Sequence, residues 1–238
     1  MSAFLYGAAL QWKLDIRSKS LLITCYAVPL LFFAIMGGIF TSVNPESKYT
    51  LIQSMTVMGV SMGALIGLPP SLVEIYASDI KNVYKANGVP LYLGLISMFF
   101  SAFIHLLMMC AIICIVAPVA FDAVLPPNLP LYFGSLAVFI AVSLSIGSVL
   151  GLSMKNQAKL TMISQIVFLP SMMLSGIMFP VNLLPQSLSS LGKIFPAAWG
   201  NLTMTSETFK PSLFIPLLVM FFAAIIACGY ALSKKSKE

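Results

Sequence analysis

The sequence predicts an all-α integral membrane protein, and both its composition and its long apolar runs support this fold class. Of the 238 residues, 59% are hydrophobic and 8% are charged, whereas soluble globular domains carry about 25% charged residues. A chain with so little polar surface is expected to have lipid as its main solvent. The apolar runs far exceed the length of a membrane β-strand, so helices rather than a barrel are expected to span the bilayer.

The whole chain, residues 1–238, is expected to form one transmembrane domain. Residues 1–20 mix apolar and charged side chains, which is typical of a helix lying at the membrane surface. Six spans are then predicted over about 21–40, 50–68, 91–116, 131–154, 160–178 and 213–232. The first is long enough to be a permanent span rather than the core of a signal peptide. The second is predicted to end at Pro69 and Pro70, because proline removes a helix donor.

Basic residues are distributed unequally between the two sides of this layout. Ten of the thirteen fall on one side and three on the other. The ten are Lys13, Arg17, Lys19, Lys81, Lys85, Lys155, Lys159, Lys234, Lys235 and Lys237, and the three are Lys48, Lys193 and Lys210. Because cytoplasmic loops carry the excess of Lys and Arg, both termini are predicted to be cytoplasmic. Membrane orientation also accounts for the net charge of +6, so a nucleic-acid partner is not expected.

Small residues recur every fourth position in two of the predicted spans. The second span contains Gly59, Gly63 and Gly67, and the fourth contains Ser143, Gly147 and Gly151. Such stripes let helix backbones approach closely in lipid. Packing within one bundle is the favoured interpretation, and a dimer interface or a sliding surface is the alternative.

Ionisable and nucleophilic groups are scarce inside the spans. His105 is the one intramembrane candidate, and a hydrogen bond to a neighbouring helix is favoured over a role in a proton relay. Cys110 and Cys114 share a helical face, but packing is favoured over metal binding because no His or carboxylate cluster accompanies them. No catalytic, cofactor or metal site is predicted on the chain. No phosphate-loop pattern occurs in the sequence either, so ATP hydrolysis through a Walker site is excluded.

Two loops carry most of the functional information. The cytoplasmic stretch 74–87 has the pattern of a short amphipathic helix that could dock on a partner, although its composition alone favours an ordinary interfacial loop. Its candidate contact residues are Glu74, Asp79, Lys81, Val83, Tyr84 and Lys85. The extracellular stretch 181–210 and the residues before it are too apolar for a solvated loop and too broken for a span. A short re-entrant hairpin between spans five and six is expected there, because irregular backbone at membrane depth must be covered by protein. Its motif residues are Gly176, Phe179, Pro180, Pro185 and Pro196.

At these loops the chain resembles the permease subunits of bacterial type-2 ABC exporters, which include drug, antimicrobial-peptide, sodium and polysaccharide exporters. The segment 174–181, LSGIMFPV, carries the more specific part of the match, and the segment 74–95 matches more loosely. The other residues that carry the resemblance are Pro185, Leu188, Ile194 and Pro196 in the outer loop, and Glu74, Lys81, Val83, Asn87, Val89, Pro90 and Leu95 in the inner one. The resemblance implies that 74–87 is a coupling helix seated in a separate ABC ATP-binding subunit, which would bind ATP and Mg. It also implies a second permease chain, identical or different, and a bacterial plasma membrane.

The function expected from this resemblance is export of an apolar or amphiphilic substrate such as a drug, a lipid-like molecule or an antimicrobial peptide. Flexible, polarizable side chains that adapt to apolar substrates indicate the candidate substrate pathway. They are Met55, Met58, Met62, Met162, Phe168 and Met172. Two alternatives stay open, namely a membrane immunity or scaffold protein that does not pump, and a membrane-embedded enzyme that uses His105 and Glu74.

Overall fold

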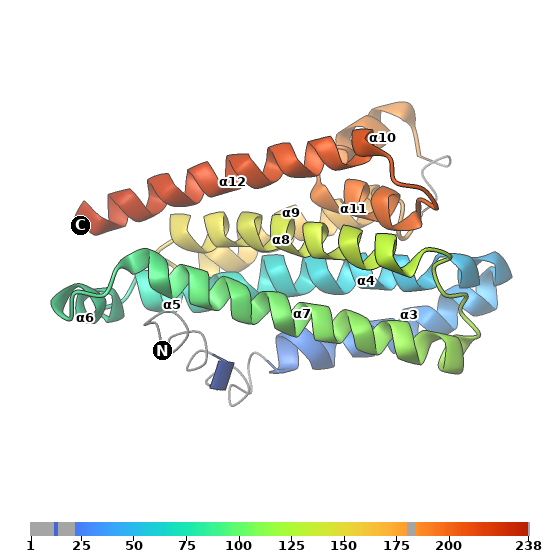
Figure 1. Cartoon of the computed structure of the whole chain (residues 1–238), viewed down its shortest axis with the longest axis horizontal. Helices are drawn as coiled ribbons and strands as arrows, with labels where there is room; N and C mark the ends of the chain where they lie inside the picture. The colour runs from blue at the N-terminus through green and yellow to red at the C-terminus, as the bar shows by residue number, and fades with distance from the viewer. Residues whose placement is uncertain (1–11, 14–21, 180–183, 238) are drawn as a thin grey trace.

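The structure is a computed structural model that describes residues 12–13, 22–179 and 184–237, and every regular element in these residues is helical. The long helices run side by side along an elongated bundle, as Figure 1 shows, while the shorter helices α6 (Ile80–Ala86), α10 (Gln186–Gly192) and α11 (Pro196–Thr205) lie near its ends. The predicted all-α fold is therefore confirmed for the described residues. The surface helix predicted over 1–20 lies outside them, except that Trp12 and Lys13 are helical.

Within the described part of the chain, five helical stretches are long and apolar enough to cross a membrane. They are Ile23–Val43, Leu51–Tyr76, Leu91–Phe121, Leu129–Ser153 and Pro211–Lys235. The first consists of the π-helical turn η1 (Ile23–Ala27) and α3 (Val28–Val43), and the 3-10 turn η2 (Pro45–Tyr49) follows it. The second consists of α4 (Leu51–Met62), the π-helical turn η3 (Gly63–Gly67) and α5 (Leu68–Tyr76). The other three are α7 (Leu91–Phe121), α8 (Leu129–Ser153) and α12 (Pro211–Lys237).

The fifth predicted span appears as α9 (Gln157–Leu174), which is not among these five stretches. Its 18 residues would extend about 27 Å, close to the thickness of a bilayer core. However, Gln157, Lys159 and Gln165 make it less apolar than the other long helices. The six-span layout therefore stays a prediction.

The second span does not end at Pro69 and Pro70 as expected, because the helix continues to Tyr76. The two prolines lie in the first turn of α5, where a missing backbone N–H is tolerated. The turn before them is π-helical, and the Leu68 N–H donates to the carbonyl oxygen of Gly63. This wider turn changes the hydrogen-bond pattern just ahead of the prolines, so the chain passes them without ending the helix.

The stretch 74–87 is also divided differently from the prediction. Glu74 belongs to the end of α5, the chain bends at 77–79, and only Ile80–Ala86 forms the separate helix α6. Ser78 explains the bend, because its hydroxyl donates to the Glu74 carbonyl oxygen at 2.5 Å and accepts from the Ile80 N–H at 3.2 Å. Such local bonds from a serine side chain compete with continuation of the helix.

The centre of the bundle is the helix formed by α4 and α5. Every residue of α4 from Leu51 to Ser61 is buried, and α8 packs along α5 and the η3 turn. In the core, the Thr56 hydroxyl lies 2.7 Å from the Tyr132 hydroxyl and links α4 to α8. By contrast, α12 exposes large apolar side chains along much of its length, including Val219 and Ile226. It lies at the edge of the bundle, packed mainly on α8 (Figure 1).

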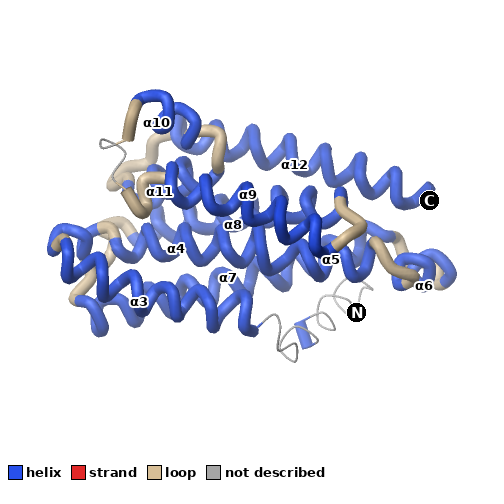
Figure 2. The backbone as a smooth tube through the Cα atoms, turned by 180° about the vertical axis from the view of Figure 1, so that it is seen from behind, coloured by secondary structure: helices blue, strands red, loops and turns tan. Residues whose placement is uncertain are grey.

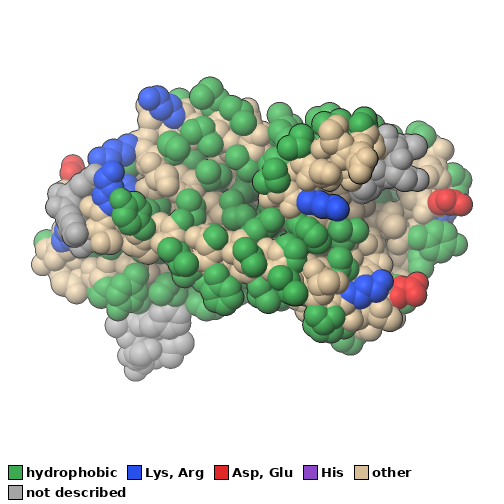
Figure 3. Space-filling view, turned by 90° about the horizontal axis from the view of Figure 1, so that it is seen from above, with side chains coloured by type: hydrophobic (Ala, Val, Ile, Leu, Met, Phe, Trp, Pro, Cys, Tyr) green, Lys and Arg blue, Asp and Glu red, His purple; other side chains and the backbone are tan. Residues whose placement is uncertain are grey.

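The two ends of the bundle differ in charge. One end, called here the Lys-rich end, carries α6 and the C-terminal end of α12, and the opposite end carries η2, α10 and α11 (Figure 2). The lysines at the Lys-rich end are Lys81, Lys85, Lys155, Lys159, Lys234 and Lys235, and those at the opposite end are Lys48, Lys193 and Lys210. Figure 3 shows blue side chains at the Lys-rich end and, at the opposite end, blue side chains together with red ones, with mostly green and tan atoms over the middle. The fold thus groups the lysines as the alternate-side count predicted, while which end faces the cytoplasm stays a prediction.

Each end is fixed by contacts between segments distant in sequence. At the opposite end, Lys48 forms an ion pair with Asp122 at 3.3 Å, and the Val124 N–H donates to the Lys48 carbonyl oxygen at 2.9 Å. At the Lys-rich end, the buried ammonium of Lys235 donates to the Tyr76 carbonyl oxygen at 3.1 Å. The last contact joins the end of α12 to the end of α5.

Candidate functional site

Helix α6 is the most exposed helix of the Lys-rich end, and none of its residues is buried. Its apolar side chains Ile80 and Val83 are 40% and 59% exposed. The helix ends because Gly88 adopts a positive φ of 65°, a conformation that favours glycine. The Asn87 side-chain amide donates to the Val83 carbonyl oxygen at 2.8 Å and satisfies one of the last carbonyls of the helix. An exposed apolar surface beside charged groups is typical of an interaction site.

The six residues predicted to contact a partner do not all lie on this exposed surface. Asp79, Val83 and Lys85 are exposed, and Lys81 is half-exposed. Glu74 is exposed too, but it lies on α5, before the bend. Tyr84 points back toward α7, because a Cβ added to Gly94 would lie 3.4 Å from its ring and from its hydroxyl. Tyr84 therefore packs between α6 and α7. Val83 is the apolar residue of this set that is exposed to a partner.

Beside the contact of Tyr84 with α7, a hydrogen bond joins α5 to α7. The Tyr76 hydroxyl donates to the Leu91 carbonyl oxygen at 2.6 Å, and a Cβ on Gly94 would lie 3.0 Å from the same hydroxyl. The Val89 N–H also donates to the Tyr84 carbonyl oxygen at 2.9 Å. The first bond joins the end of α5 to the start of α7, and the second closes the C-terminal end of α6 where the chain turns into α7.

The predicted glycine stripes contact neighbouring helices of the same chain. Gly59 and Gly63 face Met109 and Leu106 of α7, and Gly67 faces η1. A Cβ on Gly147 would overlap the Ala64 carbonyl oxygen, and a Cβ on Gly151 would lie 2.9 Å from the Pro69 carbonyl oxygen. The five glycines are Gly59, Gly63, Gly67, Gly147 and Gly151. The structure thus gives each of them a packing role inside the bundle.

Most residues of the predicted substrate pathway lie inside the core of the chain. Met55, Met58, Phe168 and Met172 are buried, and Met62 is half-buried. Met162 is 57% exposed on α9. Sequence alone could not separate these positions, because α4 is buried on every side from Leu51 to Ser61, its polar Gln53 and Thr56 included.

A cavity that the sequence did not indicate lies at the end opposite α6. It has a volume of about 560 Å³, and its walls come from the end of α3, the η2 turn, the start of α4, the segment after α9 and α11. Its lining includes Phe40, Asn44, Glu46, Thr50, Gly176, Ile177, Asn201 and Thr205. No sequence pattern marks such a cavity, since its residues come from segments far apart in the chain.

The residues of the predicted re-entrant motif surround this cavity or begin the short helices beside it. Gly176 lines the cavity and has a positive φ of 84°, which explains a glycine at this turn. Pro185 precedes α10 and Pro196 begins α11. Phe179 is exposed, and Pro180 lies outside the described residues. The segment therefore forms two short helices, and its depth in a membrane stays a prediction.

His105 is buried and lies among aromatic side chains. The Tyr26 hydroxyl of η1 lies 2.7 Å from His105 Nδ1, which is the hydrogen bond to a neighbouring helix that was expected. The Trp12 ring stacks on the imidazole with centroids 4.4 Å apart. The Trp12 ring therefore packs on α7. Among the described residues, no group of three His, Cys, Asp or Glu side chains could hold a metal ion.

Comparison with known families places these features in context. The family model described as ABC-2 type transporter matches residues 3–209 and covers every described element before α12. No curated protein matches the chain. This family comprises the membrane components of transporters, which have no ATPase site of their own and normally pair with an ABC ATP-binding subunit. Together with the five long apolar helices, the match shows a multi-pass membrane protein, and the chain belongs to the ABC-2 type transporter family as a permease component.

Proposed function

We propose that the chain is the permease subunit of an ATP-driven exporter in a bacterial plasma membrane, with both termini in the cytoplasm. A separate ABC subunit binds ATP and Mg and seats α6 in its surface. The observation that carries the proposal is the exposed α6 at the Lys-rich end, with Val83 presented outward. The lysine excess at that end supports a cytoplasmic position, where an ATP-binding subunit would be.

The connections of α6 suggest how a motor could act on the bundle. A three-residue bend joins α6 to α5, and α5 continues through η3 into α4, the most enclosed helix of the chain. Because Tyr84 and Tyr76 contact α7 at the same level, a push on α6 would move α5 and α7 together. The π-helical turn at Gly63–Gly67 is the position where α4 and α5 can change their relative angle.

An apolar or amphiphilic substrate is supported by the cavity between α7, α8 and α12. This cavity has a volume of about 420 Å³, within the usual range for small-molecule sites. Its walls are mainly apolar and aromatic, including Leu95, Phe99, Phe100, Phe221 and Ile225. A second permease chain would complete the transport pathway, which would then run between the two chains rather than through the closed core of one.

The proposal is tested by purifying the chain with the ATPase that carries a phosphate loop and is encoded beside it. We expect the two proteins to purify as a complex, and we expect vesicles containing the complex to export a fluorescent amphiphile only with ATP and Mg. The control is an ATPase whose phosphate-loop lysine is replaced by alanine. Failure of the ATPase to bind, together with unchanged export when the chain is deleted, would contradict the proposal. Protection of cells from a membrane-active peptide that persists with the inactive ATPase would instead indicate a protein that sequesters without pumping.

A further inference from the structure

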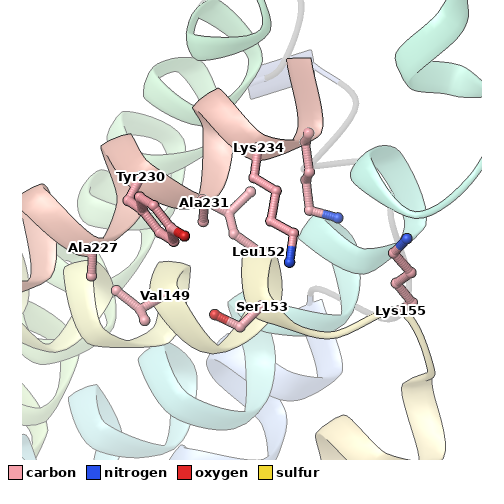
Figure 4. A pocket seen from close by; sticks show the side chains of 9 residues that line it. Val149, Leu152, Ser153, Lys155, Ala227, Tyr230, Ala231 and Lys234 are labelled. Atoms are coloured by element: carbon pink, nitrogen blue, oxygen red, sulfur yellow. The ribbon is translucent and has the colours of Figure 1, made fainter. Parts of the chain in front are cut away.

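A cavity with a basic lining lies at the Lys-rich end, between the end of α8 and the end of α12. Its volume is about 290 Å³. The polar groups that line it are Ser153, Lys155, Tyr230, Lys234 and Lys235. In Figure 4 the Lys234 side chain extends from α12 toward α8, with the Ser153 and Tyr230 hydroxyls to one side and Lys155 to the other.

The chemistry of this lining favours an anion with several oxygen atoms. Three lysines contribute positive charge, and no carboxylate is among the residues that line the cavity. The hydroxyls of Ser153 and Tyr230 can donate further hydrogen bonds. Lys235 already donates to the Tyr76 carbonyl oxygen, so its positive charge is held in place beside the cavity. A phosphate group matches this set of donors.

An apolar groove continues from the basic cavity toward the middle of the bundle. It has a volume of about 290 Å³ and is formed by α8 and α12. Ile146, Leu150, Met220 and Ala223 line it, and it shares Val149 and Ala227 with the basic cavity. Apolar groups are therefore aligned along the helices, and basic groups are placed where these helices end. A phospholipid carries its groups in the same arrangement, with apolar acyl chains in the bilayer core and a charged phosphate at the bilayer surface.

We propose that the basic cavity binds the phosphate headgroup of an anionic membrane lipid, with an acyl chain in the adjoining groove. The lipid would connect α8 to the edge helix α12, which contacts few other long helices. Charge complementarity and the continuity of the two cavities carry this assignment. It concerns a bound lipid rather than the transported substrate, so it stands whether or not the proposed export function is correct.

The test uses the full chain in detergent and measures lipid binding by native mass spectrometry. Three probes are compared, namely dioleoyl phosphatidylglycerol, dioleoyl phosphatidylcholine and glycerol 3-phosphate. The test variant combines Lys155→Gln with Lys234→Gln. The matched control combines Lys193→Gln with Lys210→Gln, which removes the same charge at the opposite end. Because each lysine near an anionic headgroup favours binding by about five-fold, we expect the test variant, which lacks two of them, to bind phosphatidylglycerol about 25-fold more weakly.

The proposal predicts that the control variant binds phosphatidylglycerol as the unmodified chain does, and that phosphatidylcholine and glycerol 3-phosphate bind weakly to all variants. Equal weakening by the control variant would mean that general charge, not this cavity, attracts the lipid, and the proposal would be overturned. Tight binding of glycerol 3-phosphate would assign the site to a free phosphate compound. Unchanged lipid binding with loss of the ATPase complex in the test variant would assign it to a protein partner.

Discussion

Replacing Gly147 with alanine is expected to destabilise the folded chain more than any other single-methyl change in the glycine stripes. The added Cβ would overlap the carbonyl oxygen of Ala64, which belongs to the backbone of the central helix and cannot turn away as a side chain can. Overpacking a core in this manner costs about 1–3 kcal/mol. We expect a lower midpoint of thermal unfolding for the purified protein in detergent, measured by intrinsic fluorescence.

The same helix provides a matched control. Gly134 of α8 is exposed, and a Cβ there would meet nothing within 4 Å, so Gly134→Ala should keep or raise stability by up to about 1 kcal/mol. A Gly59→Ala variant should lie between the two, since the added Cβ meets the flexible end of Met109 at 2.7 Å. Equal unfolding midpoints for Gly147→Ala and Gly134→Ala would contradict the close approach of α8 to η3.

Replacing Val83 with aspartate is expected to abolish coupling between the partner ATPase and transport. Val83 is 59% exposed in the chain alone, so the change should not disturb the fold. In the complex, however, it would bury an unpaired charge where an apolar side chain was seated. The lost apolar contact and the desolvation of the charge together should weaken binding of the ATPase by at least about 100-fold. The measurement combines the affinity for the ATPase with ATP-dependent export in vesicles.

Two further variants separate docking from folding. Val83→Thr has nearly the same shape and no charge, so it should retain most of the affinity. Tyr84→Asp should lower the unfolding midpoint as well as the affinity, because Tyr84 packs beside Gly94 of α7. Wild-type affinity and export rate in the Val83→Asp variant would remove α6 from the coupling mechanism.

The features that sequence predicted best depend on long, local patterns. Apolar runs predict the helices, and the positions of the lysines predict which loops lie at the same end of the bundle. Both patterns follow from the insertion of the chain into lipid. The hydrogen bond from His105 to a neighbouring helix was also predictable, since a buried imidazole needs a partner. Tyr26 as the partner could not be predicted, because it lies 79 positions away in the chain.

The features that sequence missed depend on how helices meet. Pro69 and Pro70 do not end the second helix, because a π-helical turn precedes them, and no sequence pattern indicates that turn. Sequence assigned Tyr84 to the outer surface, yet its orientation depends on the absence of a side chain at Gly94. The basic cavity at Lys155 and Lys234 joins residues separated by most of the last third of the chain. Such sites become visible only when the helices are assembled.

The side of the membrane on which α6 lies decides whether a cytoplasmic ATPase can bind it. All four native cysteines are buried, so a membrane-impermeant maleimide should label a single introduced cysteine over a low background. The Asn82→Cys change marks α6, and the Thr208→Cys change marks the opposite end of the bundle. Both native side chains are exposed. We expect α6 to be labelled only in inside-out vesicles and position 208 to be labelled only in intact cells. Labelling of α6 in intact cells would place it on the outer side of the membrane, away from any cytoplasmic ATPase, and would rule out α6 as the coupling helix.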